Sequence, residues 1–535
     1  MANTGDKSTR AGEIGVFQVF ESKEGTKRFA DLSLGCVELS YYEDILSNSV
    51  SVSAVIVESG LSDSKIGSGN NKGYVGILDN LPIVGGESVN LVFRDNQTNT
   101  TTLKFLGARS GNGNEFYVNR VRQVSPGTQR DVYYLDLCTR EFISNEQARV
   151  VKRYDGTIGE NVLKILKGKL SGDGGIITPK GVEIDPTAKP YNFIGNDRKP
   201  FYVCTWLAAK SIPVLSVDGK DAIGGAAGYF FYETYDGFKF KAIDVLNGQA
   251  PKKKFIFTNT TGLPQGYDAK ILDVNVERDI DLQQNLTMGA YANRTLFFDY
   301  VSMNYKVRDY TLTENQKDKV NNAGKKSFGD GVSPAIKDAP SRIMNKVLDI
   351  GTLPSGITAD DQLEKWKEDP TKSTFASAET VAQSAMRYNQ MFTIKINITI
   401  AGDFSLRAGD MIFCEFPELT VAQNKLPNKQ TGGNYLIASV CHRLTPEDCY
   451  TSLTLVRDSF GKKPPAIRTG SSSSSSTSSS TSSSGLSSRE RTFARRSSSA
   501  SAQANTNRFG QNVKTSPNAA PTDWAARRRA RRGSS

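Results

Sequence analysis

A strict alternation of apolar and polar side chains in "FTIKINITI", residues 392–400, limits the possible folds more than any other feature of this sequence. The apolar positions are Phe392, Ile394, Ile396, Ile398 and Ile400. Successive side chains of an extended strand point to opposite faces, so this segment can bury one face and leave the other in water. The pattern predicts a half-buried strand in a β-sheet or barrel.

Similar short strands recur near the N-terminus. Residues 14–138 contain "NSVSVSAVIVES", "ESVNLVF", "EFYVNRVRQV" and "RDVYYLDL", separated by Gly-, Asn- and Asp-rich turns. Many short strands with such turns are typical of a barrel or sandwich. We therefore expect an N-terminal arm at 1–13, a first β unit at 14–138, and a second β unit that includes 391–458.

The densest aromatic stretch is "GYFFYETYDGFKFKAID", residues 228–244. Asp-Gly at its centre favours a tight hairpin turn. A platform for stacking ligands is one interpretation of the aromatic side chains, but aromatic residues on alternating strands are more often sheet core. We therefore predict core positions at Phe230, Phe231, Phe238 and Phe240.

Between the β units the sequence indicates an α/β insertion at 139–225 and 250–390. Thr157 and Glu160 have the spacing of a capping box, which predicts a helix in "TIGENVLKILKGKL". Pro200 suits the first turn of a second helix. We also expect helices in "SRIMNKVLDI" and "SAETVAQSAMRYNQM".

The charge of the chain is unevenly distributed. The net charge is +11, but residues 471–535 alone hold 11 Lys+Arg and two acidic residues. The rest is nearly neutral, which argues against a general nucleic-acid-binding surface. The Ser-rich run from Gly470 lacks the apolar area needed to fold, so 459–535 is expected to be a flexible tail.

The end of this tail is the one candidate binding segment. Its candidate residues are Trp524, Arg527, Arg528, Arg529, Arg531 and Arg532. The arginines suit phosphates or an acidic protein partner. The alternative is a solvated tail that contacts nothing.

Motifs of catalysis are scarce. His442 is the single histidine, and nucleotide-binding and nucleophile-elbow motifs are lacking. We expect no catalytic residue, no metal and no cofactor, and His442 is expected to be an ordinary sheet residue. "ERDID", residues 277–281, leaves open a lysozyme-like pair of carboxylates, but a charged face or a helix N-cap at Asp281 is the preferred interpretation.

Cysteine usage and hydropathy bear on the compartment. The six cysteines are scattered and are expected to be buried thiols. The first residues show no apolar signal region, and no stretch approaches about 18 apolar residues. We expect assembly in a cytoplasm and no membrane insertion.

The order of these segments resembles that of the baseplate hub proteins of contractile-tailed bacteriophages, the late-control-D-like family, over about residues 14–458. The resemblance is carried by "YDGTIGENVLKIL", by "KPFYVCTWLAAKSIP" leading into the aromatic hairpin, and by "ITIAGDFSLRAGDMIF" with "GGNYLIASVCHRLTPEDCYTSLTLVRD". These are patterns of hydrophobicity and turns. The Ser/Arg-rich tail departs from the family pattern.

The resemblance implies a mainly β fold with an α+β insertion and two tail-tube-like barrels, the second built from 226–249 and 391–458. It also implies a homotrimer that forms a pseudo-six-fold hollow ring. In the phage baseplate, such a ring joins a hexameric tail tube to a trimeric central spike, contacts other baseplate proteins and lets DNA pass.

Three other functions stay open at the level of sequence. One is the hub half of a bacterial contractile injection system, which has the same two-barrel plan. Another is a cell-wall-degrading tail enzyme, and a third is nucleic-acid binding through the tail. The chain is expected to be a structural protein of the virion tail and not an enzyme.

Overall fold

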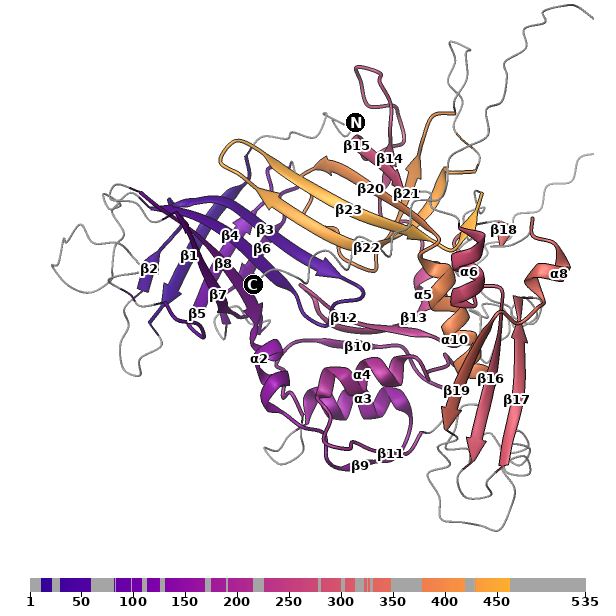
Figure 1. The fold of residues 1–535 in the computed structure, drawn as a ribbon. Helices are drawn as coiled ribbons and strands as arrows, with labels where there is room; N and C mark the ends of the chain where they lie inside the picture. The colour runs from indigo at the N-terminus through magenta and orange to yellow at the C-terminus, as the bar shows by residue number, and fades with distance from the viewer. Residues whose placement is uncertain are drawn as a thin grey trace, which may run out of the picture. The chain divides into compact units, whose positions relative to one another are not determined.

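In the computed structural model, all the residues described below belong to one compact unit within residues 1–467 (Figure 1). They are 11–21, 29–58, 81, 83–97, 99–107, 113–125, 130–168, 175–188, 191–214, 226–277, 281–299, 304–312, 322–324, 326–327, 331–347, 378–418, 428 and 430–461.

The N-terminal strands form a six-stranded barrel. The strands are β1 (Glu13–Phe20), β2 (Phe29–Asp31), β3 (Cys36–Asp44), β4 (Ser51–Glu58), β5 (Ser88–Arg94), β6 (Thr102–Phe105), β7 (Phe116–Ser125) and β8 (Asp131–Thr139). Strands β2 and β3 act as one bent strand, because β2 pairs with β1 on one side of the barrel and β3 pairs with β4. The ladders then run in a circle, β1–β2/β3–β4–β8–β7–β5, and β6 is added beside β5.

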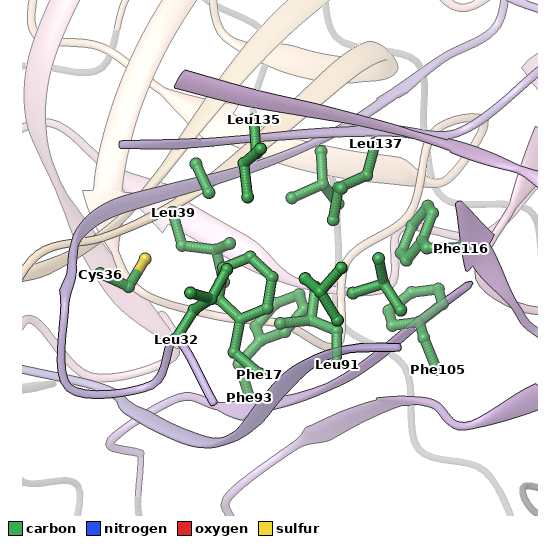
Figure 2. Packing of buried hydrophobic residues seen from close by; sticks show 14 of the residues in the cluster. Phe17, Leu32, Cys36, Leu39, Leu91, Phe93, Phe105, Phe116, Leu135 and Leu137 are labelled. Atoms are coloured by element: carbon green, nitrogen blue, oxygen red, sulfur yellow. The ribbon is translucent and has the colours of Figure 1, made fainter. Parts of the chain in front are cut away.

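The interior of this first barrel is apolar and contains several aromatic rings in contact with one another. Phe17, Leu91, Phe93, Phe105 and Phe116 converge from the four strands β1, β5, β6 and β7 (Figure 2). The rings of Phe105 and Phe116 lie 4.4 Å apart between centroids. Burying each such side chain contributes about 1.5–3 kcal/mol, and this is why inward positions on these strands alternate with outward polar ones.

A second six-stranded barrel is formed by segments far apart in the sequence. Its strands are β14 (Lys254–Ile256), β15 (Ala269–Glu277), β20 (Ile394–Ala401), β21 (Met411–Glu415), β22 (Gly433–Leu444) and β23 (Cys449–Arg457). The ladders close in the order β22–β21–β14–β15–β20–β23. Ile394, Ile396 and Ile398 point into its core. The mainly β fold with a discontinuous second barrel is therefore confirmed.

The segment that completes this barrel differs from the one expected. The aromatic hairpin, β12 (Tyr229–Thr234) and β13 (Gly237–Ala242), pairs with β10 (Val182–Ile184) in a separate three-stranded sheet. The prediction that 226–249 joins the second barrel is therefore wrong. Residues 254–277 take that place, because β14 and β15 supply the edges that pair with β21 and β20.

The two barrels repeat one topology. In chain order, the bent strand β2/β3, β4, β5, β7 and β8 of the first correspond to β15, β20, β21, β22 and β23 of the second. The ladders that join these strands are antiparallel in both barrels. The strand β14 takes the position of β1, but it is short and runs in the opposite direction, since its ladders are parallel.

Two local irregularities repeat at the same places in both barrels, although the bulges at Gly15 of β1 and Val124 of β7 have no counterpart in the second barrel. An extra residue interrupts the ladder at Val37 in β3 and at Leu272 in β15. The same occurs at Asn119 in β7 and at Ala438 in β22. Because bulges re-aim a strand at a fixed position, this agreement allows residue-by-residue alignment of the two barrels.

The turns before β5 and β21 support this alignment. Gly86 and Gly409 both have positive φ, +92° and +86°. Gly86 N donates to the carbonyl of Val118 at 2.7 Å, and Gly409 N donates to that of Ile437 at 2.8 Å. Glycine adopts this backbone conformation without the strain that a side chain would bring.

An α/β layer holds the aromatic hairpin. It comprises α2 (Arg140–Gln147), β9 (Arg153–Tyr154), α3 (Ile158–Lys167), β10, β11 (Phe193–Ile194), α4 (Pro200–Ala208), β12, β13 and α5 (Ile243–Asn247). Thr157 and Glu160 form the expected capping box of α3, and Pro200 begins α4 as expected. Phe231, Phe238 and Phe240 pack against these helices.

The remaining elements form a third region. They are α6 (Leu282–Met288), β16 (Ala292–Asp299), β17 (Asn304–Thr311), β18 (Lys326–Ser327), α8 (Pro334–Lys337), β19 (Arg342–Val347), α10 (Ala378–Met391) and β24 (Ser459–Phe460). The expected helix at α10 is present. The helix expected in "SRIMNKVLDI" is instead strand β19, which pairs in parallel with β16. No helix within the described ranges is long and apolar enough to cross a membrane.

Candidate functional site: the barrel junction

The two barrels meet through a continuous β ladder. Residues Leu39–Asp44 of β3 pair antiparallel with Ser439–Leu444 of β22. Strand β22 pairs with β23 along one edge and, on its other edge, first with β21 and then with β3. The bulge at Ala438 marks the change of partner. The ladder therefore joins both barrels in one 14-stranded sheet.

Side chains also cross between the barrels. Two residues from the second barrel are buried in the core of the first: Phe404, which follows β20, and Leu444, the last residue of β22. The Phe404 ring meets Phe93 edge-on, 5.5 Å between centroids. The carboxylate of Asp95 accepts from Phe404 N at 3.0 Å. We call the β3–β22 ladder with these crossing contacts the barrel junction.

A buried carboxylate, Glu43, lies near one end of the ladder in the barrel junction. It accepts from the Tyr41 hydroxyl at 2.7 Å, from Tyr235 N at 2.8 Å and from Ala408 N at 2.9 Å. Burial raises the pKa of Glu43 although Arg407 and these hydrogen bonds oppose the shift. Because the three donors come from β3, the aromatic hairpin and the segment before β21, this one side chain ties three parts together.

A second buried cluster connects the first barrel to the α/β layer. Lys180 Nζ lies 2.9 Å from Glu141 Oε2 and 2.5 Å from Glu233 Oε1. Glu233 Oε2 also accepts from Val50 N and the Thr139 hydroxyl, both at 3.1 Å. Burial lowers the pKa of Lys180, but the two carboxylates outweigh it and the pKa is raised. The lysine therefore stays charged, and it holds β12 of the hairpin to α2.

A third cluster connects the hairpin to the second barrel. Arg387 of α10 is 1% exposed; its Nη2 donates to Asp244 Oδ1 at 2.8 Å and its Nη1 to Asp458 Oδ2 at 3.2 Å. Asp244 lies in α5, directly after the hairpin, and Asp458 directly follows β23. Asn247 Nδ2 donates to Asp458 as well, at 3.1 Å. Buried charges persist only when they are paired in this way.

His442 takes part in packing at the barrel junction. Its ring stacks on Tyr41, 5.7 Å between centroids, and Nδ1 lies 3.0 Å from Thr451 Oγ1. Burial, followed by the charge of Arg407, lowers the pKa of His442 to about 3. The ring is therefore neutral near pH 7, and its complete burial keeps it from any substrate.

Asp281 and the six cysteines, the other residues considered for chemistry, have structural roles. Asp281 caps α6, accepting from Gln283 N and Gln284 N at 2.8 and 3.2 Å. All six cysteines are free thiols and five of them are buried. In the parts of the chain that the structure describes, no group of three or more His, Cys, Asp or Glu side chains is placed to hold a metal ion.

The residues predicted as barrel core divide among three places. Ile394, Ile396 and Ile398 line the second barrel. Phe231, Phe238 and Phe240 lie in the α/β core, so their predicted place in a barrel is wrong. Phe230 and Phe392 pack between the hairpin and the outer face of the second barrel. The tail residues Trp524, Arg527, Arg528, Arg529, Arg531 and Arg532 lie outside the described residues.

The buried charges of these clusters were not expected from the sequence. A signal for two of them exists, because Glu43 follows "SYY" in a strand and Glu233 follows "YFFY". An isolated carboxylate in an aromatic strand is costly to bury without a partner. The partners Lys180 and Arg407 come from loops distant in sequence, and no local pattern identifies them.

Comparison with known proteins gives the following. No family model and no curated protein matches the sequence. Among solved structures, the fold is similar to the 43 kDa tail protein of prophage MuSo2 from Shewanella oneidensis, with a TM-score of 0.42, 10% identity, and coverage of 83% of this chain and 98% of that one. A tail protein from Neisseria meningitidis MC58 has a TM-score of 0.41 and 10% identity, with coverage of 83% of this chain and 96% of that one. The E. coli c3393 protein, a component of the type VI secretion system, has a TM-score of 0.32 and 10% identity, with coverage of 84% of this chain and 80% of that one.

Proposed function

We propose that this chain is a structural baseplate hub protein of a contractile phage tail. Three copies form a hollow ring with pseudo-six-fold symmetry, in which each copy supplies two barrels. The ring joins a hexameric tail tube on one side to a trimeric central spike on the other. It is a component of the virion tail, contacts other baseplate proteins, and is assembled in the host cytoplasm.

The observation that carries this proposal is the repeat of one barrel topology within the chain, with the two copies joined edge to edge. A structure that must match six-fold symmetry on one side and three-fold symmetry on the other requires two similar units in each subunit. The strand order and bulges of the two barrels meet that requirement. The sequence resemblance to the hub family supports the same function.

The charge clusters around the barrel junction fit a mechanical role. Each of the three connects different layers, and each is buried. Closely packed protein interiors have low compressibility and transmit strain. The nearly neutral body suits a channel that lets DNA pass without holding it, since binding of phosphates depends on a positive surface.

The mass of the purified assembly tests the proposal. We expect light scattering to give three times the chain mass of 58.4 kDa and averaged particle images to show a ring with a central hole. A stable assembly whose number of chains is not divisible by three contradicts the proposal. A peptidoglycan zymogram is expected to show no clearing.

Deletion of residues 470–535 is expected to leave the trimer intact. The barrels and their junction lie entirely before this segment, and the tail composition cannot supply a packed core. Light scattering of the shortened chain beside the full chain measures the effect. Loss of the trimer on deletion would show that the tail takes part in assembly, contrary to the modular organisation proposed.

A further inference from the structure

Each barrel has a strand with an edge that is paired over only part of its length. In the first barrel, β7 pairs with β5 through Phe116 and Tyr117. In the second, β15 pairs with β14 through Ala269 and Lys270. Within the described residues, no ladder covers the same edges farther along, over 119–125 and 271–277. Unpaired edges of this kind promote pairing with another strand.

Strands β22 and β3 have the same kind of edge, and these two edges are paired with each other. Strand β22 of the second barrel corresponds to β7, and β3 of the first corresponds to β15. The second halves of β22 and β3 form the barrel junction. The chain therefore pairs the edges of β22 and β3 internally. Along the described residues, the corresponding edges of β7 in the first barrel and β15 in the second have no partner strand.

We infer that β15 of one copy pairs antiparallel with β7 of the next copy, repeating the β3–β22 ladder between subunits. The occupant of both edges is thus a second copy of this chain. The inference rests on the proposed ring and adds which strands join its subunits. It is a head-to-tail contact, and a closed ring of such contacts leaves neither of these two barrel edges open.

The alignment of the barrels fixes the register of this ladder. By the bulges and ladders, Tyr42 corresponds to position 277 and Cys441 to position 122. Tyr42 and Cys441 are directly opposite in the barrel junction. Up to a further bulge at Val124 of β7, the register therefore places positions 122 and 123 of β7 against 277 and 276 of β15, with position 122 opposite position 277.

The charges at these positions are complementary. Position 122 is arginine and position 277 is glutamate. Arg122 is exposed, with 45% of its side chain accessible, and is 3.4 Å from the carboxylate of Asp136, itself partly exposed. Arg120 on β7 and Asp273 on β15 are also exposed. They add a second positive charge to the β7 edge and a second negative charge to the β15 edge. Opposite charges directly across an antiparallel pair stabilise it, and like charges weaken it.

Apolar exposure at the same edge agrees with a buried contact. Leu272 and Val276 of β15 are 47% and 46% exposed, although both belong to a barrel strand. Val276 lies opposite Ile396, which is fully buried. A neighbouring strand along this edge would cover both side chains and remove apolar area from water.

Charge reversal tests the inference in the full-length chain. We expect Arg122→Glu to raise the concentration at which half of the chains assemble by about tenfold or more. Glu277→Arg is expected to do the same, and the double variant to recover most of the loss. Lys346→Glu, an exposed charge on β19, is the matched control and should leave assembly unchanged. Circular dichroism spectra show whether each variant remains folded.

Cross-linking tests the register independently of stability. One copy carries Arg122→Cys, another carries Glu277→Cys, and the two are co-expressed with different tags. Mild oxidation is expected to give a reducible dimer of the two tagged chains. Arg122→Cys with Asn275→Cys is the out-of-register control, since diagonal positions are about 7–8 Å apart and too distant for a strain-free disulfide. The unsubstituted chain measures any reaction of the native cysteines.

The outcomes separate this inference from the proposed function. A trimeric mass without the 122–277 cross-link, and with assembly unaffected by charge reversal, overturns the ladder and leaves the ring standing. A monomeric mass for the unsubstituted chain overturns both. A cross-link that is stronger for 122–275 than for 122–277 overturns the register.

Discussion

Replacing Lys180 by methionine is expected to destabilise the folded chain by about 3–5 kcal/mol, the usual effect of removing one partner from a buried ion pair. Lys180, Glu141 and Glu233 are at most 2% exposed, and the lysine is within 3 Å of both carboxylates. Methionine keeps most of the side-chain volume, but it leaves Glu233 without a cation and Glu141 with only Arg140, whose Nη2 is 3.7 Å from Glu141 Oε1. The thermal unfolding midpoint of the full chain measures the loss.

The loss in the Lys180→Met variant should depend on pH with a definite sign. Burial already raises the pKa of Glu233 in the folded chain, and removing Lys180 takes away a charge that opposes this shift. A carboxyl group whose pKa is raised on folding favours the folded state below its unfolded pKa and disfavours it as the pH rises. The variant should therefore be closer to the original protein near pH 4 than near pH 8.

Two controls accompany this measurement. Lys199 forms an exposed pair with Glu146, so Lys199→Met should change stability by less than about 1 kcal/mol. Adding Glu141→Gln and Glu233→Gln to Lys180→Met removes the uncompensated charges and should recover part of the loss. Equal unfolding midpoints for Lys180→Met and Lys199→Met would contradict the role assigned to this cluster.

Phe238→Ala is the second large effect, an expected loss of about 3–5 kcal/mol from a cavity in a closely packed core. Phe238 is fully buried, and its ring centroid lies 5.6 Å from that of Phe201 and 5.8 Å from that of Phe231. Because α4 and the hairpin meet through these rings, the α/β layer should unfold at a lower temperature. The thermal unfolding midpoint of the full chain again measures the change.

Phe142→Ala serves as the matched substitution. Phe142 lies in α2 of the same layer and is 37% exposed, so its truncation should cost far less. Comparing Phe238→Ala with Phe142→Ala also tests how much the aromatic hairpin contributes to stability. Glu233 and Tyr235 of this hairpin form hydrogen bonds with the first barrel. If Phe238→Ala lowers the unfolding midpoint no more than Phe142→Ala, the aromatic cluster is not the core of this layer.

Local features were predicted well because they depend on neighbours in the sequence. The alternation of Ile394, Ile396 and Ile398 with polar residues is a property of the strand itself, and so is the Asp-Gly turn of the hairpin. The capping box of α3 needs only Thr157 and Glu160. Each of these signals is complete within a few residues.

Predictions that required a partner strand were less successful. The segment "SRIMNKVLDI" has no periodicity that excludes a helix, and it becomes strand β19 through a parallel ladder with β16. Similarly, β14 is three residues long and offers almost no pattern of its own. Its place in the second barrel depends on the edges offered by β21 and β15.

By itself, the sequence determined that the chain is mainly β and where many of its strands and helices lie, whereas the discontinuous second barrel was implied only by the resemblance to the hub family. Only the tertiary structure decided that 254–277 completes this barrel while the aromatic hairpin joins the α/β layer. The physical reason is that alternation tells which face of a strand is buried, but not which edge pairs with it. Edge pairing uses backbone groups that are alike in nearly all residues, so the choice of partner is made by the packing of the whole chain.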